Sequence, residues 1–192
     1  MKEYPSITTV WRPGHYHIYK KLDGSNIRVE WNKKQGFNKW GRRHGLLDDS
    51  NPILKRAPPL FLDIYSVAIE KIMASERIQE ATFFMEFWGP NSFAGNHLES
   101  EQQTVTLFDI SVYKKGFLKP KEFEDMFRGK VPLPEVTVGP IGANVLQDLK
   151  SETGHEGYVF KSANHIFKAK TFWWLEKLKG ICKTEEEFKR RA

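Results

Sequence analysis

The run Lys21-Leu22-Asp23-Gly24 has the most direct chemical potential in this sequence. A lysine amine can act as a nucleophile toward the α-phosphate of a nucleotide, and the Asp-Gly pair makes a tight backbone bend that lets a phosphate approach closely. The motif alone is weak, because K-x-D-G consists of common residues and most lysines are solvated surface charges. Its interpretation therefore depends on which other groups the chain supplies.

A lysine needs help from its surroundings to become a nucleophile. With an ordinary pKa of about 10.4, it is almost wholly protonated at neutral pH. Neighbouring cations and removal from solvent both favour the neutral amine. Lys20 adjoins Lys21, and the spacing of Lys168 and Lys170 places both on one face of a later strand. We therefore expect Lys21 to lie in a cationic crevice with these lysines and a bound metal.

The pair Lys168 and Lys170 is also a candidate binding group in its own right. Two cations at strand spacing repel each other, and an anionic ligand would relieve that repulsion. The alternative is a solvated pair on the surface.

Carboxylates inside apolar segments are candidate ligands, because an unpaired charge is costly to bury. Glu86 lies in an aromatic run, so it is either a ligand or, if strand alternation points its side chain to water, a solvated charge. The same two interpretations apply to Asp109, for which the sequence gives a weaker indication. Glu156 enters a strand in which alternation predicts that it faces away from Lys161. A bound triphosphate calls for Mg²⁺ held by few carboxylates, which Glu156, and Asp23 or Glu86, could provide.

Short strands and a few helices are expected to position these residues. Alternation and turn signals predict strands at residues 16–20, 27–31, 36–43, 81–88, 104–112, 135–138, 157–161 and 165–170. The first three are expected to form a meander around the Asp23-Gly24 bend. Helical spacing and caps predict helices from Pro58 to about residue 77 and at residues 121–127, 171–178 and 183–191. Many antiparallel strands with interspersed helices indicate an α+β fold.

Length and composition indicate one folded domain over residues 1–192. Of the 192 residues, 40% are hydrophobic and 14% aromatic, which suits a globular core rather than a disordered chain. The net charge of +6 favours a polyanionic partner, nucleic acid before an acidic membrane, with a merely soluble basic protein as the alternative. A single cysteine, Cys182, and the lack of a signal peptide or membrane-spanning run predict a cytoplasmic protein without an internal disulfide.

Taken in chain order, these pieces resemble the covalent nucleotidyltransferase superfamily of polynucleotide ligases and mRNA capping enzymes. The closest resemblance is to ATP-dependent RNA ligases of the RNA ligase 2 and RNA-editing ligase group, and it extends from about residue 17 to residue 172. Each motif alone is weak, but their occurrence in the family's order is specific. The resemblance implies an α+β nucleotidyltransferase (ATP-grasp-like) fold of antiparallel sheets flanked by helices.

Three of the family's motifs concern the nucleotide. Lys21-Leu22-Asp23-Gly24-Ser25-Asn26 resembles the first motif, whose lysine becomes covalently adenylylated. An aromatic run resembles the third motif, whose glutamate, in this chain Glu86, holds the ribose. A later strand resembles the element whose aromatic side chain, in this chain Phe108, stacks on adenine. The resemblance also implies that Asp23 and Gly24 lie at the nucleotide.

The remaining motifs concern metal, phosphate and nucleic acid. Glu156–Lys161 resembles the fourth motif, with a metal-associated glutamate, and Lys168-Ala169-Lys170 resembles the fifth, a lysine pair that contacts the phosphates. Arg42-Arg43-His44-Gly45 resembles a strand end whose arginine lies beside the incoming 5′-phosphate, and Arg43 matches better than Arg42.

The resemblance implies ATP and Mg²⁺ or Mn²⁺ as cofactors and RNA, or a nicked RNA/DNA duplex, as the partner. Lys21 would attack the α-phosphate of ATP and expel pyrophosphate. The AMP would pass to a 5′-phosphate end, and a 3′-hydroxyl would then attack to seal the strand. Asn26 and Arg28 would lie near the AMP or the nucleic-acid phosphate.

The chain departs from this group's pattern in three places. Lys20 stands where the group often has a glutamate that contacts the adenine amino group, so the choice between ATP and GTP is open. Position 23 is Asp, as in DNA ligases and capping enzymes. The 22 residues after Lys170 are too few for an OB-fold or a typical RNA-ligase C-terminal domain, so we expect no OB-fold, and a basic surface or a partner in its place.

Several alternatives remain beside the RNA ligase. One is a DNA ligase or a GTP-using capping-type enzyme, and another is a sealing-deficient relative that only binds nucleic acid. The chain has no P-loop or Rossmann fingerprint. His15 and His17 alternate on a strand, but no nearby residue completes a zinc site. Trp173-Trp174 could stack on bases, although packing against the core is the simpler interpretation.

Overall fold

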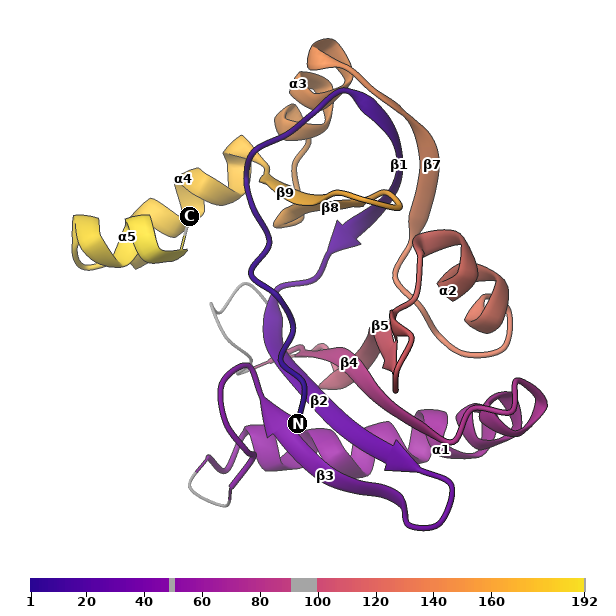
Figure 1. Ribbon diagram of the computed structural model, residues 1–192. Helices are drawn as coiled ribbons and strands as arrows, with labels where there is room; N and C mark the ends of the chain where they lie inside the picture. Colours follow the sequence, from indigo (N-terminus) through magenta and orange to yellow (C-terminus); the bar gives the residue numbers. More distant parts are fainter. Residues whose placement is uncertain (49–50, 91–99, 192) are drawn as a thin grey trace. The chain divides into compact units, whose positions relative to one another are not determined.

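The computed structural model describes residues 1–48, 51–90 and 100–191 (Figure 1). The chain divides into two compact units. Unit 1 contains Met1–Pro5 and Asp23–Leu133, and unit 2 contains Ser6–Leu22 and Pro134–Ala192. One boundary between the units therefore falls inside the Lys21–Gly24 run.

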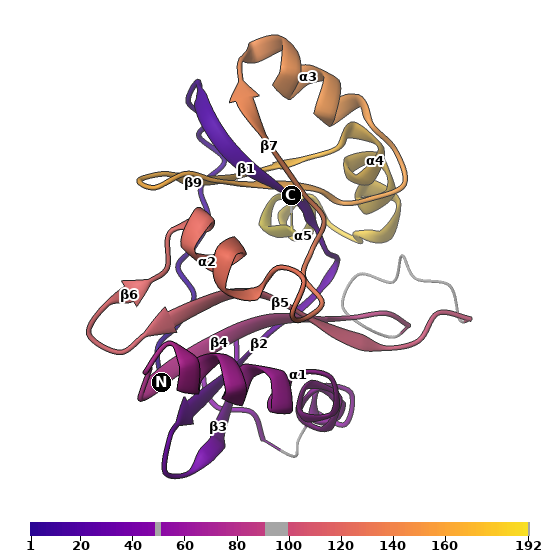
Figure 2. The ribbon, with the colours of Figure 1, turned by 90° about the vertical axis from the view of Figure 1, so that its right-hand side faces the viewer.

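Unit 1 is built on an antiparallel sheet. In the described residues its strand order is β3-β2-β4-β5-β6. The strands are β2 (Gly24–Asn32), β3 (Gly36–Arg42), β4 (Glu80–Trp88), β5 (Thr104–Val112) and β6 (Gly116–Phe117). The helical segments are η1 (Leu54–Arg56), α1 (Ala57–Ser75) and α2 (Pro120–Phe127). Figure 2 shows α1 lying across this sheet.

One face of that sheet carries the core of unit 1. The core includes fully buried side chains from β2, β4 and α1, among them Ile27, Val29, Phe61, Tyr65 and Phe83. The hydroxyl of Tyr65 donates to the carbonyl oxygen of Pro132 at 3.0 Å, and burial raises the pKa of Tyr65 to about 12. Because side chains alternate along a strand, Asn26, Arg28 and Glu86 lie on the opposite face, away from this core.

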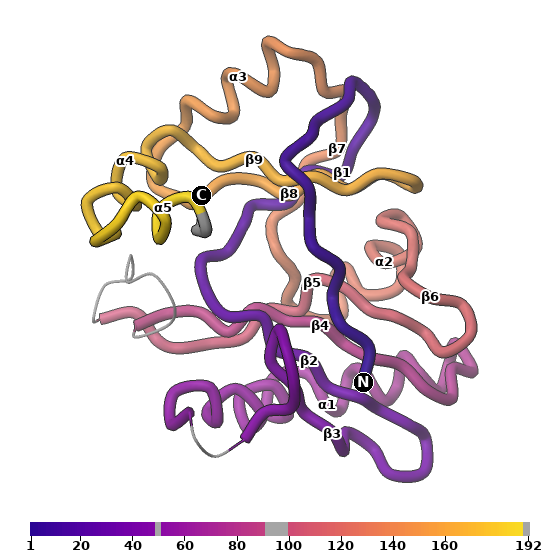
Figure 3. The backbone as a smooth tube through the Cα atoms, turned by 60° about the vertical axis from the view of Figure 1, so that its left-hand side comes forward, coloured from indigo at the N-terminus to yellow at the C-terminus, as the bar shows by residue number. Residues whose placement is uncertain are grey.

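Unit 2 contains a second antiparallel sheet, of order β7-β1-β8-β9 in the described residues. Its strands are β1 (Gly14–Lys21), β7 (Val136–Ile141), β8 (Gly157–Lys161) and β9 (Ile166–Lys170). Its helices are α3 (Ala143–Ser151), α4 (Phe172–Ile181) and α5 (Glu185–Arg191). The tube in Figure 3 shows β8 and β9 joined as a hairpin beside β1.

The core of unit 2 lies on the face of its sheet that α3 covers. It consists of side chains from β1, β7, β8, β9 and α3, namely Tyr16, Ile18, Ile141, Leu146, Phe160 and Phe167. On α4, Trp174 is buried, which agrees with a packing role, whereas the ring of Trp173 lies 4.0 Å from the amine of Lys177. Thr171 caps α4 by accepting a hydrogen bond from the amide of Trp174.

Most expected elements are confirmed, and the two antiparallel sheets with helices agree with the α+β expectation. The expected meander is wrong in one part, because β1 pairs with β7 and β8 whereas β2 pairs with β3 and β4. Alternation identifies a strand and its faces but not its hydrogen-bonding partner. Helix α3 was not predicted. No helix within the described ranges combines the length and apolar character that a bilayer crossing requires.

Candidate active site

Strand pairing in unit 2 brings the predicted nucleophile to the predicted phosphate-binding lysines. Lys21 is the last residue of β1 and lies opposite Gly157, which in turn lies opposite Lys170 at the end of β9. Because directly paired residues project from the same face of a sheet, Lys21 and Lys170 flank the space above Gly157. Lys168, opposite Val159, lies two residues earlier on the same face of β9.

Glu156 joins these two lysines. Its Oε2 lies 2.6 Å from Nζ of Lys21, and its Oε1 lies 3.0 Å from Nζ of Lys170. The side chain of Glu156 is 5% exposed and that of Lys170 is 9% exposed, whereas that of Lys21 is 22% exposed. We call Lys21, Glu156 and Lys170 the lysine–glutamate triad. The lysine expected to react is therefore the member of the triad that solvent and ligands can reach.

The charge of Glu156 follows from its neighbours. Burial by itself would raise the pKa of the Glu156 carboxyl, but the ammonium groups of Lys21 and Lys170 outweigh burial, and the pKa lies below its ordinary value. Glu156 is therefore ionised at neutral pH, and the triad carries one net positive charge. A carboxylate against an ammonium favours the charged form of the amine. The expected cationic crevice thus contains an anion in direct contact with Lys21.

The position of Glu156 corrects the prediction from strand alternation. Glu156 precedes β8, and its carbonyl oxygen accepts a hydrogen bond from the amide of Thr171 at 3.0 Å. The next residue, Gly157, has a φ of +152°, which breaks the regular alternation. Regular alternation would place the side chain of Glu156 on the face opposite to Gly157. The Glu156 carboxylate instead contacts Lys21 and Lys170, which lie on the same face as Gly157.

Gly157 is needed at this position for two reasons. Its φ favours glycine, and a Cβ atom would overlap the carbonyl oxygen of Ala169 in β9. We expect Gly157→Ala to lower the free energy of unfolding by about 2 kcal/mol or more, as measured by urea denaturation. Gly180→Ala is the matched control, because the space around Gly180 is open and alanine favours the helix α4. Equal stabilities of the two variants would contradict the assignment.

The residues expected at the ribose lie in unit 1. Glu86 is half-buried on β4 and lies directly opposite Asn26 on β2, so the two side chains share the face away from the core. Gly24 begins β2 and does not have a positive φ; instead, a Cβ atom there would overlap the carbonyl oxygen of Phe87. Close approach of two strands, rather than a tight bend, is what requires glycine at position 24. Asp23 immediately precedes this strand.

Phe108, the residue expected to stack on adenine, lies at an irregularity in the pairing of β4 and β5. Its half-buried ring meets the ring of Tyr4 edge-on, with the centroids 5.1 Å apart. The hydroxyl of Tyr4 donates to Oδ2 of the buried Asp109 at 2.9 Å. Asp109 therefore holds the N-terminal segment onto the sheet, and no feature of the sequence indicated the part played by Tyr4.

Arg28 is inside unit 1, although the resemblance implied contact with a phosphate. Its side chain is 2% exposed, and its guanidinium donates to the carbonyl oxygens of Arg43 and Gly45, each at 3.3 Å. It also donates to Oε1 of Glu3 at 3.2 Å, which lowers the pKa of the Glu3 carboxyl. In this structure Arg28 fixes the loop that carries Arg43, and its contact with a phosphate stays a prediction. Sequence reasoning did not find Glu3.

Arg42 and Arg43 are exposed at the end of β3, as a contact with nucleic acid requires. Together with Glu86, Phe108, Asn26, Asp23 and Gly24, they belong to unit 1, whereas the lysine–glutamate triad and Lys168 belong to unit 2. The structure thus joins four of the predicted residues within unit 2, by strand pairing and by the ion pairs of Glu156, and places the others on the sheet of unit 1 and its loops.

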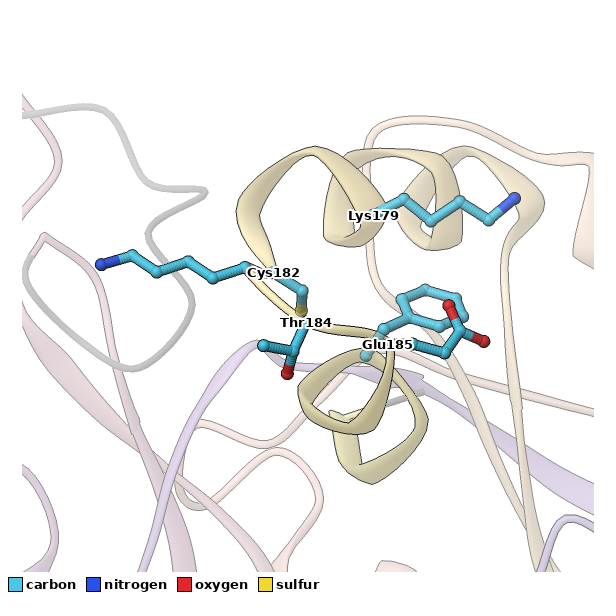
Figure 4. A pocket seen from close by; sticks show the side chains of 6 residues that line it. Lys179, Cys182, Thr184 and Glu185 are labelled. Atoms are coloured by element: carbon cyan, nitrogen blue, oxygen red, sulfur yellow. The ribbon is translucent and has the colours of Figure 1, made fainter.

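An open pocket between α4 and α5 of unit 2 contains none of these residues (Figure 4). Figure 4 shows Cys182 and Thr184 in the segment that joins the two helices. The lining consists of Lys179, Cys182, Lys183, Thr184, Glu185 and Phe188. Its location gives it no part in the chemistry considered for the triad.

Comparisons with known proteins support the fold. No protein-family model and no curated protein matches the chain. A solved structure of Naegleria gruberi RNA ligase with PPi is similar, with a TM-score of 0.63 and 19% identity over 86% of this chain and 52% of that chain. A variant of that ligase with ATP and Mn has a TM-score of 0.62 at 19% identity, covering 85% of this chain and 51% of its own. A variant with AMP and Mn has a TM-score of 0.61 at 18% identity, with the same coverage. The chain spans about half the length of these ligases. It has an RNA ligase-like fold.

Proposed function

We propose that this protein is an ATP-dependent RNA ligase that works through a covalent lysyl-AMP intermediate on Lys21. The observation that carries the proposal is the contact of Lys21 with Glu156 at 2.6 Å, in a site that also contains Lys170. These residues are far apart in the chain, and each is the one that the ligase motifs assign. The RNA ligase-like fold supports the same proposal, as do the nucleotides and Mn named for the similar ligases.

In the first step, the neutral amine of Lys21 attacks the α-phosphorus of ATP. A nitrogen–phosphorus bond forms, and the bond to the pyrophosphate oxygen breaks. Because an ammonium group has no lone pair, Lys21 must first give a proton to solvent water. Glu156 holds the side chain in place until then. Lys170 and Lys168 supply positive charge for the phosphates. The motif resemblance assigns the ribose to Glu86 and the adenine to Phe108.

The residues at the triad fit a divalent cation that arrives with a nucleotide. The described residues contain no group of three or more His, Cys, Asp or Glu that could hold a metal by themselves. Mg²⁺ and Mn²⁺ in nucleotide sites need only one or two carboxylates, because phosphate oxygens and water complete the coordination. Glu156 would provide that carboxylate. A bound cation would neutralise the charge of the triphosphate.

In the later steps, the AMP passes to a 5′-phosphate end and a 3′-hydroxyl displaces it. Arg43 would bind the 5′-phosphate, and Asn26 would lie near the AMP. We propose that residues 1–192 form a nucleotidyltransferase domain and that it acts on RNA in the cytoplasm. The similar ligases, whose names specify RNA, support RNA over DNA as the substrate.

Labelling with α-³²P-ATP tests this proposal. In the presence of Mg²⁺ or Mn²⁺, we expect label to stay with the protein on a denaturing gel and to leave when pyrophosphate is added. Added 5′-phosphorylated RNA should also remove the label. Absence of label with either metal would overturn the proposal.

Competition by unlabelled GTP addresses the nucleotide base. Lys20 stands where the group often has a glutamate. Its Nζ lies 3.7 Å from Oε2 of Glu135, and because it is next to Lys21 in β1, the two side chains point to opposite faces of the sheet. We expect ATP to compete at least about 10-fold better than GTP, as a site selective for one base requires. Preference for GTP would favour a capping-type enzyme.

A further inference from the structure

One edge of unit 1 concentrates positive charge. β3 is the edge strand of its sheet, and the segment from the β2–β3 turn to the loop after β3 carries five exposed cationic residues. They are Lys33, Lys34, Lys39, Arg42 and Arg43, which we call the basic edge. No carboxylate of the described residues forms an ion pair with any of the five. The segment 31–45 contains no acidic residue.

Protection of an edge strand explains only part of this charge. A lysine on an edge strand prevents pairing with other chains, and Lys39 in the middle of β3 suits that purpose. Lys33 and Lys34 lie in the turn before β3, and Arg42 and Arg43 lie at its end, beside Gly41, which already forms a bridge with Leu46. The 7 residues of β3 extend about 23 Å, which is several phosphate repeats of a nucleic-acid strand.

The end of the basic edge has a fixed shape. The amide of Arg42 donates to the carbonyl oxygen of Gly45 at 3.2 Å, and the guanidinium of Arg28 holds the carbonyls of Arg43 and Gly45 from inside. Gly41 leaves room for that guanidinium, because a Cβ atom there would lie 2.8 Å from Nε of Arg28. A loop ordered before binding loses less entropy on contact with a ligand.

We infer that the basic edge binds the phosphate backbone of the nucleic-acid strand on which the proposed ligase acts. Lysine and arginine are the usual phosphate ligands, and arginine can bind a phosphate through two donors. The aromatic side chains of β3, Phe37 and Trp40, pack against the core of unit 1, whereas the charged side chains that β3 exposes are all cationic. Binding is therefore independent of sequence and strongly dependent on salt. This inference rests on the proposed function for its ligand, but not on the triad.

The test removes three charges that have no part in the proposed catalysis. The variant is Lys33→Gln/Lys34→Gln/Lys39→Gln, and its control, Lys71→Gln/Lys114→Gln/Lys130→Gln, removes the same charge from other exposed positions of unit 1. We expect binding of a fluorescent 5′-phosphorylated RNA to weaken at least about 10-fold at about 0.1 M salt in the first variant only. The slope of log K against log salt should fall by about 2, since each phosphate contact on a single strand adds about 0.7.

Labelling with α-³²P-ATP in the same samples separates the two proposals. If both variants label normally and have equal RNA affinities and salt slopes, the proposed role of the basic edge is overturned and the proposal of a ligase stands. If the unaltered protein does not label and the first variant loses RNA binding, the RNA-binding role of the basic edge is supported and the proposal of a ligase is overturned. If the first variant loses binding to anionic lipid vesicles but not to RNA, the ligand assignment is wrong.

Glu3→Gln tests whether the order of the Arg43 loop contributes to RNA binding, because the two explanations predict changes of affinity in opposite directions. Glu3 accepts from Arg28 and contacts Nδ1 of His44 at 3.3 Å. Removal of an acidic group near the basic edge would strengthen RNA binding if net charge alone mattered. We expect weaker binding, by about 3-fold, because the loop of Arg43 loses part of its support. Tighter binding would show that loop order does not contribute.

Discussion

Lys21→Ala is expected to abolish transfer of labelled AMP to the protein, with a loss of at least about 10³-fold, because no other group can take the place of the attacking amine. Lys21→Arg should be equally inactive, since a guanidinium stays protonated at any pH at which the protein is folded. The fold should survive both changes. In Lys21→Ala, Glu156 keeps its contact with Lys170 at 3.0 Å. The measurement is covalent labelling at saturating ATP.

Lys20→Ala is the matched control for Lys21→Ala. The side chain of Lys20 is 44% exposed and lies 3.7 Å from Glu135, so its removal changes the local charge equally without touching the triad. We expect Lys20→Ala to retain labelling within about 10-fold. Label that persists in Lys21→Ala, or disappears in both variants, would show that the nucleophile is wrongly assigned.

Glu156→Gln should have the largest effect on stability in unit 2. The substitution leaves the ammonium groups of Lys21 and Lys170 facing each other without the carboxylate that both contact. Removal of one partner from a buried ion pair costs about 3 kcal/mol, and repulsion between the two lysines acts in the same direction. Urea denaturation at neutral pH measures this loss. Glu176→Gln, which removes an exposed partner of Lys179, should cost less than about 0.5 kcal/mol.

Acid should remove the same stabilisation from the unaltered protein. The pKa of Glu156 is lower in the folded protein than its ordinary value of 4.5. The ion pairs therefore contribute in full above pH 4.5 and are lost as the pH falls through the folded pKa. Unfolding free energy should fall more steeply below pH 4.5 in the unaltered protein than in Glu156→Gln. Parallel pH profiles for the two proteins would contradict the assigned coupling.

Local patterns predicted the elements well, because alternation and helix caps depend on neighbouring residues. Thr104–Val112 has the predicted bounds, and α1 begins within one residue of the expected Pro58. The same patterns did not predict which strands pair with each other. β1 was expected beside β2, yet it pairs with β8, which lies more than a hundred residues later in the chain. Loop closure and core packing decide such choices, and neither is visible in a short window.

The site shows the same division. The residue types and order of Lys21, Glu156, Lys168 and Lys170 can be recognised in the chain, because each comes with a local motif. Their contacts could not be deduced, since Glu156 precedes an irregular strand start and does not follow the alternation assumed for it. Arg28 matched a phosphate-binding role by type, but its burial beside Gly41 depends on the packing of β3 against β2.

The sequence by itself determined the strands, the first helix of unit 1 and the identity of the lysines and carboxylates suited to nucleotide chemistry, because these depend on side-chain type and short spacing. Only the tertiary structure decided that Glu156 contacts both Lys21 and Lys170. The reason is physical: the charge state of an amine depends on the groups within a few ångströms of it, and strand pairing between distant segments selects those groups.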